Sequence, residues 1–336
     1  SGFFNARRTW LKSTFCSEPG FCTGDVCNRN DGCYYGKLKK AIFRAHIIVV
    51  NHSLLMTDAD QPGFLPDFNS VIVDEAHNLV KSAYQQFKTK WSEQETSYLL
   101  QTVDPSFPRS ARWNNILHKI SELEPSIGHL RDDLKESVKQ AQKCLKDFML
   151  ALSEDNHNRF TPAKAYQDKP ILGLLEKVYA PVTLEIHGMK KSLEHVFSIL
   201  EKIRKSVLEM DPSRTDYSVL HSVLDRGLET TNSLMNSLIR LTENQDNDWV
   251  YWMEGEYRNP NTSKEKLIIS LHASLVDVAE TLKEQFFKRF DYCLLTSATL
   301  KVNNSFSYFV RRIGLDDSDK VITKEFLSPF LYNEQV

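Results

Sequence analysis

The chain has 336 residues, of which 41% are hydrophobic and 26% are charged, and its formal net charge is -2. This composition is typical of a globular protein with a sizeable core, and the length allows two or three domains. The near-zero charge gives no sign of a strongly basic nucleic-acid-binding protein. No apolar run approaches the ~20 residues of a membrane-spanning helix, and no signal peptide opens the chain. We therefore expect a cytoplasmic or nuclear protein that does not enter a membrane.

Four of the six cysteines lie close together near the N-terminus. Glycine, proline and polar residues separate them, so this segment has too little apolar content to fold without a cross-link or a metal. A reducing compartment disfavours disulfides. The spacing contains neither the tight C-x2-C pair of most zinc sites nor a common ferredoxin pattern, so an iron–sulfur cluster and zinc stay open as alternatives. The candidate ligands are Cys16, Cys22, Cys27 and Cys33.

A basic and aromatic stretch follows the cysteines. It carries several lysines and an arginine but no acidic residue before Met56. Such a local patch can bind phosphates although the whole chain is nearly neutral. Its two tyrosines can stack on bases, as aromatic side chains do in single-strand channels, or pack against the cysteine-rich lobe. The candidate nucleic-acid contacts are Tyr34, Tyr35, Lys37, Lys39, Lys40 and Arg44.

Two β-branched runs predict buried strands of a parallel sheet. The first is Ile47–Val50, with Asn51 and His52 at its end, and the second is Val71–Val73. A histidine at the end of a strand is most often a core or capping residue.

The second strand ends in Asp74 and Glu75, followed by Ala76 and His77. Ligands of parallel sheets bind at the carboxyl ends of the strands. There Asp74 can hold Mg²⁺, directly or through water, and Glu75 can orient or deprotonate the water that attacks a γ-phosphate. The structural alternative is an acidic first turn of a helix, because carboxylates stabilise helix N-termini.

From Lys81 to about Asn244 the hydrophobic residues recur at helical spacing. We expect one long amphipathic helix across Ile127–Leu152 and further helices across Leu193–Val207 and Leu224–Leu241, without a strand between them. This segment is predicted to be a helical insertion, and by itself it is typical of a bundle or an interaction module. Cys144 and Cys293 are predicted to be core thiols.

Strand and turn patterns return after the insertion. Trp249–Met253 and Leu267–Leu271 flank a turn-rich loop and predict a β-hairpin. Leu275–Phe287 is expected to be helical. Tyr292–Thr296 is expected to be a strand, and it leads directly into Ser297, Ala298 and Thr299.

These motifs, in this order, resemble the DinG and XPD group of superfamily 2 iron–sulfur DNA helicases, and the DinG-type members most closely. The resemblance rests on Cys22-x4-Cys27-x5-Cys33-Tyr-Tyr, the basic stretch, the run from Ala45 to Leu55, Asp-Glu-Ala-His-Asn-Leu and Ser-Ala-Thr. Phe306–Gly314 and Leu327–Phe330 match as well. In DinG-type sequences the first cluster ligand usually lies further upstream, so either Cys16 or a residue before this chain is the fourth ligand.

The resemblance implies a discontinuous α/β fold. It predicts a partial RecA-like motor domain with a parallel sheet, a large all-α insertion called the arch, and a small cysteine-rich cluster lobe. The expected divisions are a cluster lobe at 1-44, a motor domain at 45-80 and 247-328, an arch at 81-246, and the start of a linker at 329-336.

The resemblance also implies a function. The parent protein would be an ATP-dependent DNA helicase of repair or replication, translocating 5′→3′ on single-stranded or forked DNA in the bacterial cytoplasm or nucleoid. Its cofactors would be ATP, Mg²⁺ and a 4Fe-4S cluster. Asp74, Glu75 and His77 would be catalytic, Ser297, Ala298 and Thr299 would couple the ATP site to the DNA path, and Asn51 and His52 would lie near nucleic acid.

The chain contains no G-x-x-x-x-G-K-[ST] phosphate-binding loop. We therefore expect an internal fragment that also lacks the second motor domain and is inactive by itself. The alternative is a non-enzymatic, metal-stabilised module that binds nucleic acid or protein, in which Asp74 and Glu75 only stabilise a helix end.

Overall fold

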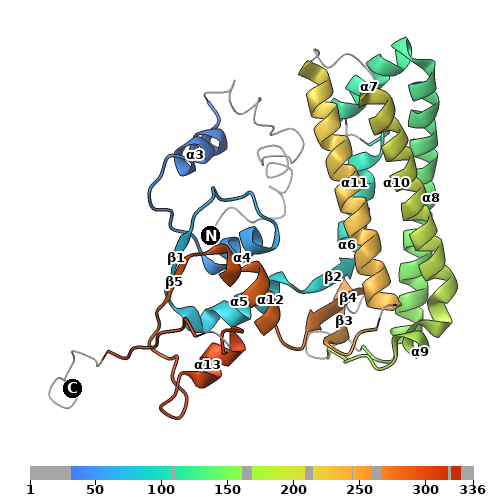
Figure 1. Cartoon of the computed structure of the whole chain (residues 1–336). Coiled ribbons are helices and arrows are strands. Elements are labelled where there is room, and N and C mark those ends of the chain that lie inside the picture. The colour runs from blue at the N-terminus through green and yellow to red at the C-terminus, as the bar shows by residue number, and fades with distance from the viewer. Residues whose placement is uncertain are drawn as a thin grey trace. The chain divides into compact units, whose positions relative to one another are not determined.

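The computed structural model describes residues 32–107, 111–160, 169–208, 215–243, 245–258, 266–316 and 319–326. Cys16, Cys22 and Cys27 and the expected linker 329-336 lie outside these residues. The chain divides into two compact units. We call Thr89–Ser274, which clusters with Ser1–Arg44, the helical unit, and Ala45–Lys88 with Leu275–Val336 the small unit (Figure 1).

The fold is mixed α/β, with a small parallel sheet in one unit and a large helical region in the other, as the sequence predicted. The expected boundaries differ from these units in three respects. The segment 1-44, expected as a separate lobe, clusters with the helices, and residues 81–88, expected in the arch, belong to the small unit. The hairpin strands, assigned to the motor domain from sequence, cluster with the helices instead.

Three long helices form the body of the helical unit, and α10 packs against both α8 and α11 (Figure 1). On α8 the residues Leu134, Val138, Ala141 and Leu145 are buried at steps of three and four, so one stripe of the helix faces the core. The three predicted long helices are thus confirmed. The helices of this unit are α6 (Glu93–Val103), α7 (Ala111–Leu123), α8 (Pro125–Asn156), α9 (Leu175–Tyr179), η4 (Ala180–Val182), α10 (Thr183–Leu208) and α11 (Thr215–Thr242).

The helical unit also contains a three-stranded sheet in the order β2-β4-β3. Its strands are β2 (Thr89–Ser92), β3 (Trp249–Arg258) and β4 (Lys266–Leu275). The hairpin prediction is confirmed, since β3 and β4 are neighbours. The sequence analysis missed β2, because four residues are too few to give a recognisable alternation. Its Trp91 is fully buried against Phe148 of α8, with ring centroids 5.3 Å apart, and this contact joins the sheet to the bundle.

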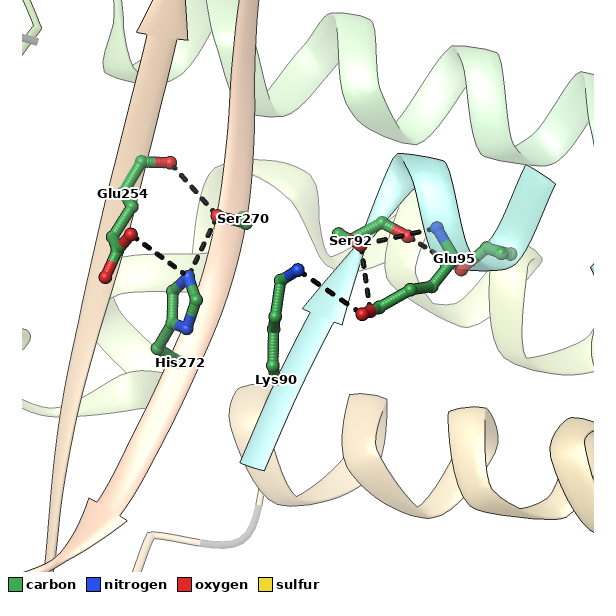
Figure 2. A network of polar contacts seen from close by, with 7 residues as sticks. Lys90, Ser92, Glu95, Glu254, Ser270 and His272 are labelled. Carbon is green, nitrogen blue, oxygen red and sulfur yellow. Dashed lines mark hydrogen bonds and ion pairs between the residues drawn. The ribbon is translucent and has the colours of Figure 1, made fainter. Parts of the chain in front are cut away.

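A polar network covers part of the opposite face of this sheet (Figure 2). His272 stacks on Trp252 at 5.3 Å and lies 2.9 Å from Ser270 Oγ. Trp252 Nε1 donates to Glu254 Oε1 at 3.0 Å, and Lys169 pairs with the same oxygen at 3.0 Å. Burial by itself would raise the pKa of the Glu254 carboxyl. The hydrogen bonds from Trp252 and Lys169 have the larger combined effect and lower this pKa to about 2.

The small unit is built on two parallel strands, β1 (Ser70–Val73) and β5 (Tyr292–Leu295). Both strand predictions are confirmed. The hydrophobic core of the unit gathers buried residues from both halves of the chain, including Met56, Val73, Leu79, Leu282 and Phe286. Its helices are α4 (His52–Asp60), η2 (Ala76–Asn78), α5 (Leu79–Gln86), α12 (Ala279–Gln285), η5 (Phe287–Arg289) and α13 (Ser307–Arg312).

Two expectations for this sheet are wrong. Residues 47–50 do not form a strand, and Ile47 and Val49 are 83% and 91% exposed. The strand β1 is only partly buried, since Ile72 is 72% exposed. A strand needs an adjacent strand to form hydrogen bonds with its backbone, and a buried strand also needs other elements packed on its apolar faces. Among the described residues, nothing pairs with 47–50 and nothing covers Ile72. Cys293 is likewise exposed on β5, whereas Cys144 is partly buried against the helical core.

A buried ion pair braces α4 inside the small unit. Asp58 is fully buried, and its Oδ2 accepts a hydrogen bond from Arg289 of η5 at 2.8 Å. Its Oδ1 accepts backbone N–H groups of the following turn, among them that of Leu65 at 2.9 Å. Burial disfavours the charged carboxyl, but these donors prevail and lower the pKa of Asp58. The carboxylate therefore holds the end of α4 against a segment more than 200 residues away.

Candidate functional site

Strand pairing brings the two polar motifs of the small unit side by side. In the parallel register Val73 lies opposite Leu295, the last residue of β5. The ladder continues past both strands, because Thr296 N–H donates to the Val73 carbonyl at 2.9 Å and Ala76 N–H donates to the Thr296 carbonyl at 3.0 Å. The residues that follow the two strands therefore share one edge of the sheet.

The turn after β1 holds Glu75 in an unusual backbone conformation. Glu75 has φ 49 and ψ 43, in the left-handed region, which costs roughly 1–2 kcal/mol for a residue other than glycine. The turn is stabilised locally, since Asp74 Oδ1 accepts the Glu75 N–H at 2.9 Å and Asn78 N–H donates to the Glu75 carbonyl at 2.9 Å. Both carboxylates are exposed at this edge.

His77 connects this turn to the loop after β5. Its Nδ1 lies 2.8 Å from Ser297 Oγ and 3.3 Å from Glu75 Oε2. A ring protonated on Nδ1 can donate toward either oxygen, since the carboxylate and the hydroxyl can both accept. Thr299 N–H also donates to Ser297 Oγ at 3.3 Å. The side chain of Ala298 is a methyl group and cannot form a hydrogen bond. Of the residues predicted at this edge, the structure brings together Asp74, Glu75, His77, Ser297 and Thr299.

Asn51 and His52 make hydrogen bonds that the sequence analysis did not specify, and their predicted proximity to nucleic acid stays a prediction. Asn51 is the N-cap of α4, and its Oδ1 accepts the Leu54 N–H at 2.8 Å. His52 Nε2 lies 2.9 Å from the carbonyl oxygen of Asp74. The placement of His52 at the end of a β-branched run suggested a capping residue. No sequence signal indicated which carbonyl it binds.

The oxygen atoms at this edge are hard ligands suited to Mg²⁺. Asp74 has one carboxylate oxygen in the local turn, which leaves the other as a candidate for the ion or its water shell. When bound, Mg²⁺ would neutralise charge on phosphate oxygens. Glu75 lies next to that position and is held toward His77, so it is the candidate base. The described residues contain no glycine-rich phosphate loop, in keeping with the sequence.

Six of the eight predicted nucleic-acid contacts lie on or just after α3 (Tyr34–Ile42), and the other two, Asn51 and His52, lie at the start of α4. Tyr34 is 89% exposed, and Lys39 Nζ lies 5.3 Å from the ring centre of Tyr35. The four basic residues Lys37, Lys39, Lys40 and Arg44 are all exposed. Cationic and aromatic groups are therefore available on this short helix, and their contact with nucleic acid stays a prediction.

Cys33 is the one predicted metal ligand within the described residues. It is the N-cap of α3, where its Sγ accepts the Gly36 N–H at 3.4 Å. A helix N-terminus stabilises a thiolate, so Cys33 suits an iron or zinc ligand chemically. Within the residues that the structure describes, no three His, Cys, Asp or Glu side chains gather as a metal site. The other three cysteines lie outside those residues, so the cluster remains a prediction.

A separate polar pocket of about 570 Å³ lies in the helical unit beside the network of Figure 2. The ionic groups around it neutralise one another. Lys90 pairs with Glu95 at 3.3 Å, Lys169 with Glu254 at 3.0 Å, and Lys266 with Glu93 at 2.8 Å. None of the residues predicted to be functional lines this pocket, and its balanced charge does not indicate a ligand.

Fold and site together define an α/β protein with an acidic edge at the carboxyl ends of parallel strands, where such sheets bind ligands. Comparison with known sequences is consistent with this class. The chain is 26% identical to the ATP-dependent DNA helicase YoaA of Haemophilus influenzae over 321 residues and 24% identical to that of Escherichia coli over 326 residues, 94% of this chain in both cases. It is 27% identical to the 3'-5' exonuclease DinG of Bacillus subtilis over 320 residues, 90% of this chain.

The resemblance to DinG-type helicases is thereby confirmed over nearly the whole chain. No protein-family model matches the chain. The chain spans 32% of the Bacillus protein and 41% and 42% of the two YoaA proteins. Among the described residues, no helix is long and apolar enough to cross a membrane.

Proposed function

We propose that the protein containing this chain is an ATP-dependent DNA helicase that moves along single-stranded DNA. The observation that carries the proposal is the contact between His77 and Ser297 at 2.8 Å, which joins the Asp-Glu-Ala-His turn to the Ser-Ala-Thr loop at one sheet edge. The names of the YoaA relatives support the same activity. The Bacillus relative is named an exonuclease, so the helicase activity needs a direct measurement.

Each residue at the edge has a distinct proposed role. Asp74 holds Mg²⁺ directly or through water, and Glu75 accepts the proton of the water that attacks the γ-phosphate. His77 orients Glu75. Through its contact with Ser297 it also couples the conformation of this turn to that of the loop carrying Ala298 and Thr299. The phosphate-binding loop and the cationic group that stabilises the transition state come from parts of the protein outside this chain.

The remaining predicted features complete the proposal. The helices between residues 81 and 246 are the arch, and the exposed cations of α3 bind phosphates of single-stranded or forked DNA. Cys22, Cys27 and Cys33, with Cys16 or an upstream residue, hold a 4Fe-4S cluster. The protein acts in DNA repair or replication in the bacterial cytoplasm, and 5′→3′ movement follows from the family resemblance.

The test is DNA-stimulated phosphate release by the full-length protein at saturating Mg·ATP. Glu75→Gln keeps the size of the side chain but removes its basicity, so turnover should fall by ~10²-fold or more while ATP and DNA still bind. Glu122→Gln, at an exposed position of α7, is the matched control and should behave as wild type. Near wild-type turnover of Glu75→Gln would show that the acidic pair is structural and favour a non-enzymatic binding module.

A further inference from the structure

The peptide between Asp74 and Glu75 is held at both of its polar ends. Its N–H, on Glu75, donates to Asp74 Oδ1 at 2.9 Å. Its C=O, on Asp74, lies 2.9 Å from His52 Nε2. A carbonyl oxygen can only accept a hydrogen bond, so Nε2 of His52 must carry the proton and donate. This peptide therefore has its orientation set by a side chain 22 residues earlier in the chain.

The orientation of this peptide determines where Glu75 points. Glu75 has φ 49, and a residue in the left-handed region persists only when its surroundings hold it there. Rotation of the peptide before Glu75 would change φ of Glu75 and move its carboxylate away from His77, which now lies 3.3 Å from Glu75 Oε2. The hydrogen bond from His52 opposes that rotation.

His52 is itself attached to a firmly held helix. It is the first residue of α4, whose N-cap Asn51 accepts the Leu54 N–H at 2.8 Å. Near the other end of α4, buried Asp58 binds Arg289 at 2.8 Å. Thr57 Oγ1 also donates to Gln86 of α5 at 3.0 Å, and α5 follows the Asp-Glu-Ala-His turn. The donor nitrogen of His52 is thus fixed relative to the strand that delivers Asp74.

We propose that His52 is a positioning residue for ATP hydrolysis: its Nε2–H holds the Asp74 carbonyl and thereby keeps Glu75 in the left-handed conformation that aims its carboxylate at the reacting water. The inference rests on the proposed function. It assigns to His52 a role different from the nucleic-acid contact expected from the sequence. Because the role needs only a hydrogen-bond donor at Nε2, another side chain with a donor at the same reach should replace it.

The experiment compares three variants in the full-length protein by steady-state kinetics with ATP and saturating single-stranded DNA. His52→Ala removes the donor, so kcat should fall about tenfold or more, the scale of a small misplacement of a catalytic group, while KM for ATP changes less than about threefold. His52→Gln places an amide N–H near the position of Nε2 and should recover kcat to within about threefold of wild type. His46→Ala, an exposed histidine of the same unit, is the matched control.

Three results would overturn the inference. The first is wild-type kcat in His52→Ala. The second is an equal loss in His52→Ala and His52→Gln when both melt at the wild-type temperature, since the donor would then be irrelevant. The third is weakened DNA binding with normal kcat at saturating DNA, which would make His52 a nucleic-acid contact. Failure of the proposed function is distinguishable, because wild type would then lack DNA-stimulated ATPase activity or Glu75→Gln would retain it.

Discussion

His77 Nδ1 lies 2.8 Å from Ser297 Oγ although the two residues are 220 positions apart. The contact joins the two loops by side chains in addition to the backbone bond from Ala76 to Thr296. If it couples ATP hydrolysis to movement on DNA, breaking it from either side should have the same effect.

We therefore expect His77→Ala and Ser297→Ala each to lower the number of base pairs unwound per ATP by several-fold. The double variant should be no worse than the more affected single variant, because residues that act through one contact are not additive. The measurement is unwinding of a forked duplex alongside phosphate release in the full-length protein, with His118→Ala on α7 as control. Additive losses would show that the two residues act separately.

Asp74→Asn should weaken Mg²⁺-dependent nucleotide binding without disturbing the turn. In the wild type, Asp74 Oδ1 accepts the Glu75 N–H at 2.9 Å, and the amide oxygen of Asn can accept the same hydrogen bond. The negative charge beside the metal is lost, however. We expect the Mg²⁺ concentration for half-maximal ATP binding to rise about tenfold or more. The check is a Mg²⁺ titration of ATP binding to the full-length protein. An unchanged midpoint would remove Asp74 from the metal site.

The triple variant of Lys37, Lys39 and Lys40 to Ala should bind single-stranded DNA more weakly, and about equally for all sequences. Phosphate contacts release counterions, so the slope of log affinity against log salt should become shallower by roughly 0.7 per lost contact. The measurement is DNA affinity at several salt concentrations. If the slope is unchanged, these exposed lysines are solvated surface and do not bind the DNA backbone.

Protein purified without air should contain iron and sulfide, be brown, and absorb through sulfur-to-iron charge transfer. Cys33→Ser should lose most of the iron, because the thiolate at the start of α3 is one of the proposed ligands. Cys144→Ser, on α8, is the control and should keep it. Stoichiometric zinc without iron in anaerobic protein would contradict the cluster and leave a zinc site.

Glu254 should make stability depend on acid pH. The pKa of its carboxyl is ordinarily 4.5 and is about 2 in the folded protein, so its contribution to stability is present above pH 4.5 and is lost as the pH falls toward 2. Glu254→Gln removes a partner of Trp252 and Lys169 and should destabilise the protein by about 1 kcal/mol at pH 7, a value reduced for partial exposure. Denaturant unfolding at several pH values should show the difference from wild type shrinking below pH 4.5. A difference that does not change with pH would exclude this carboxylate as its source.

The sequence predicted those elements whose signal is repeated along the chain. The helix α8 carries many turns of the same apolar stripe, and β1 and β5 each combine β-branched or apolar residues with a polar motif directly afterwards. The sequence placed Asp74 and Ser297 each at the carboxyl end of a strand, but it did not predict that these two strands are neighbours. The structure supplies that pairing, and neighbouring parallel strands place their carboxyl ends together.

The remaining features depend on contacts between distant residues. Asp58 and Arg289 are 231 positions apart, and neither has a local pattern that indicates burial or pairing. The strand β2 is defined by its pairing with β4 more than by its own four residues. The run 47–50 has the composition of a strand, but composition supplies no neighbour. The left-handed Glu75 is not favoured by its residue type and is held by surrounding hydrogen bonds.

The pairing of Thr89 with Ala273 has a consequence for folding. These residues lie at the two ends of the segment Thr89–Ser274, which is inserted between the two parts of the small unit. The pairing therefore holds the two ends of this insertion next to each other. If the insertion folds first, it brings Lys88 and Leu275 close before β1 meets β5, and the small unit avoids most of the entropy cost of closing so long a loop. Local contacts of the helices form fast, whereas pairing of distant parallel strands is slow. The late step of folding would then be the assembly of the acidic edge itself.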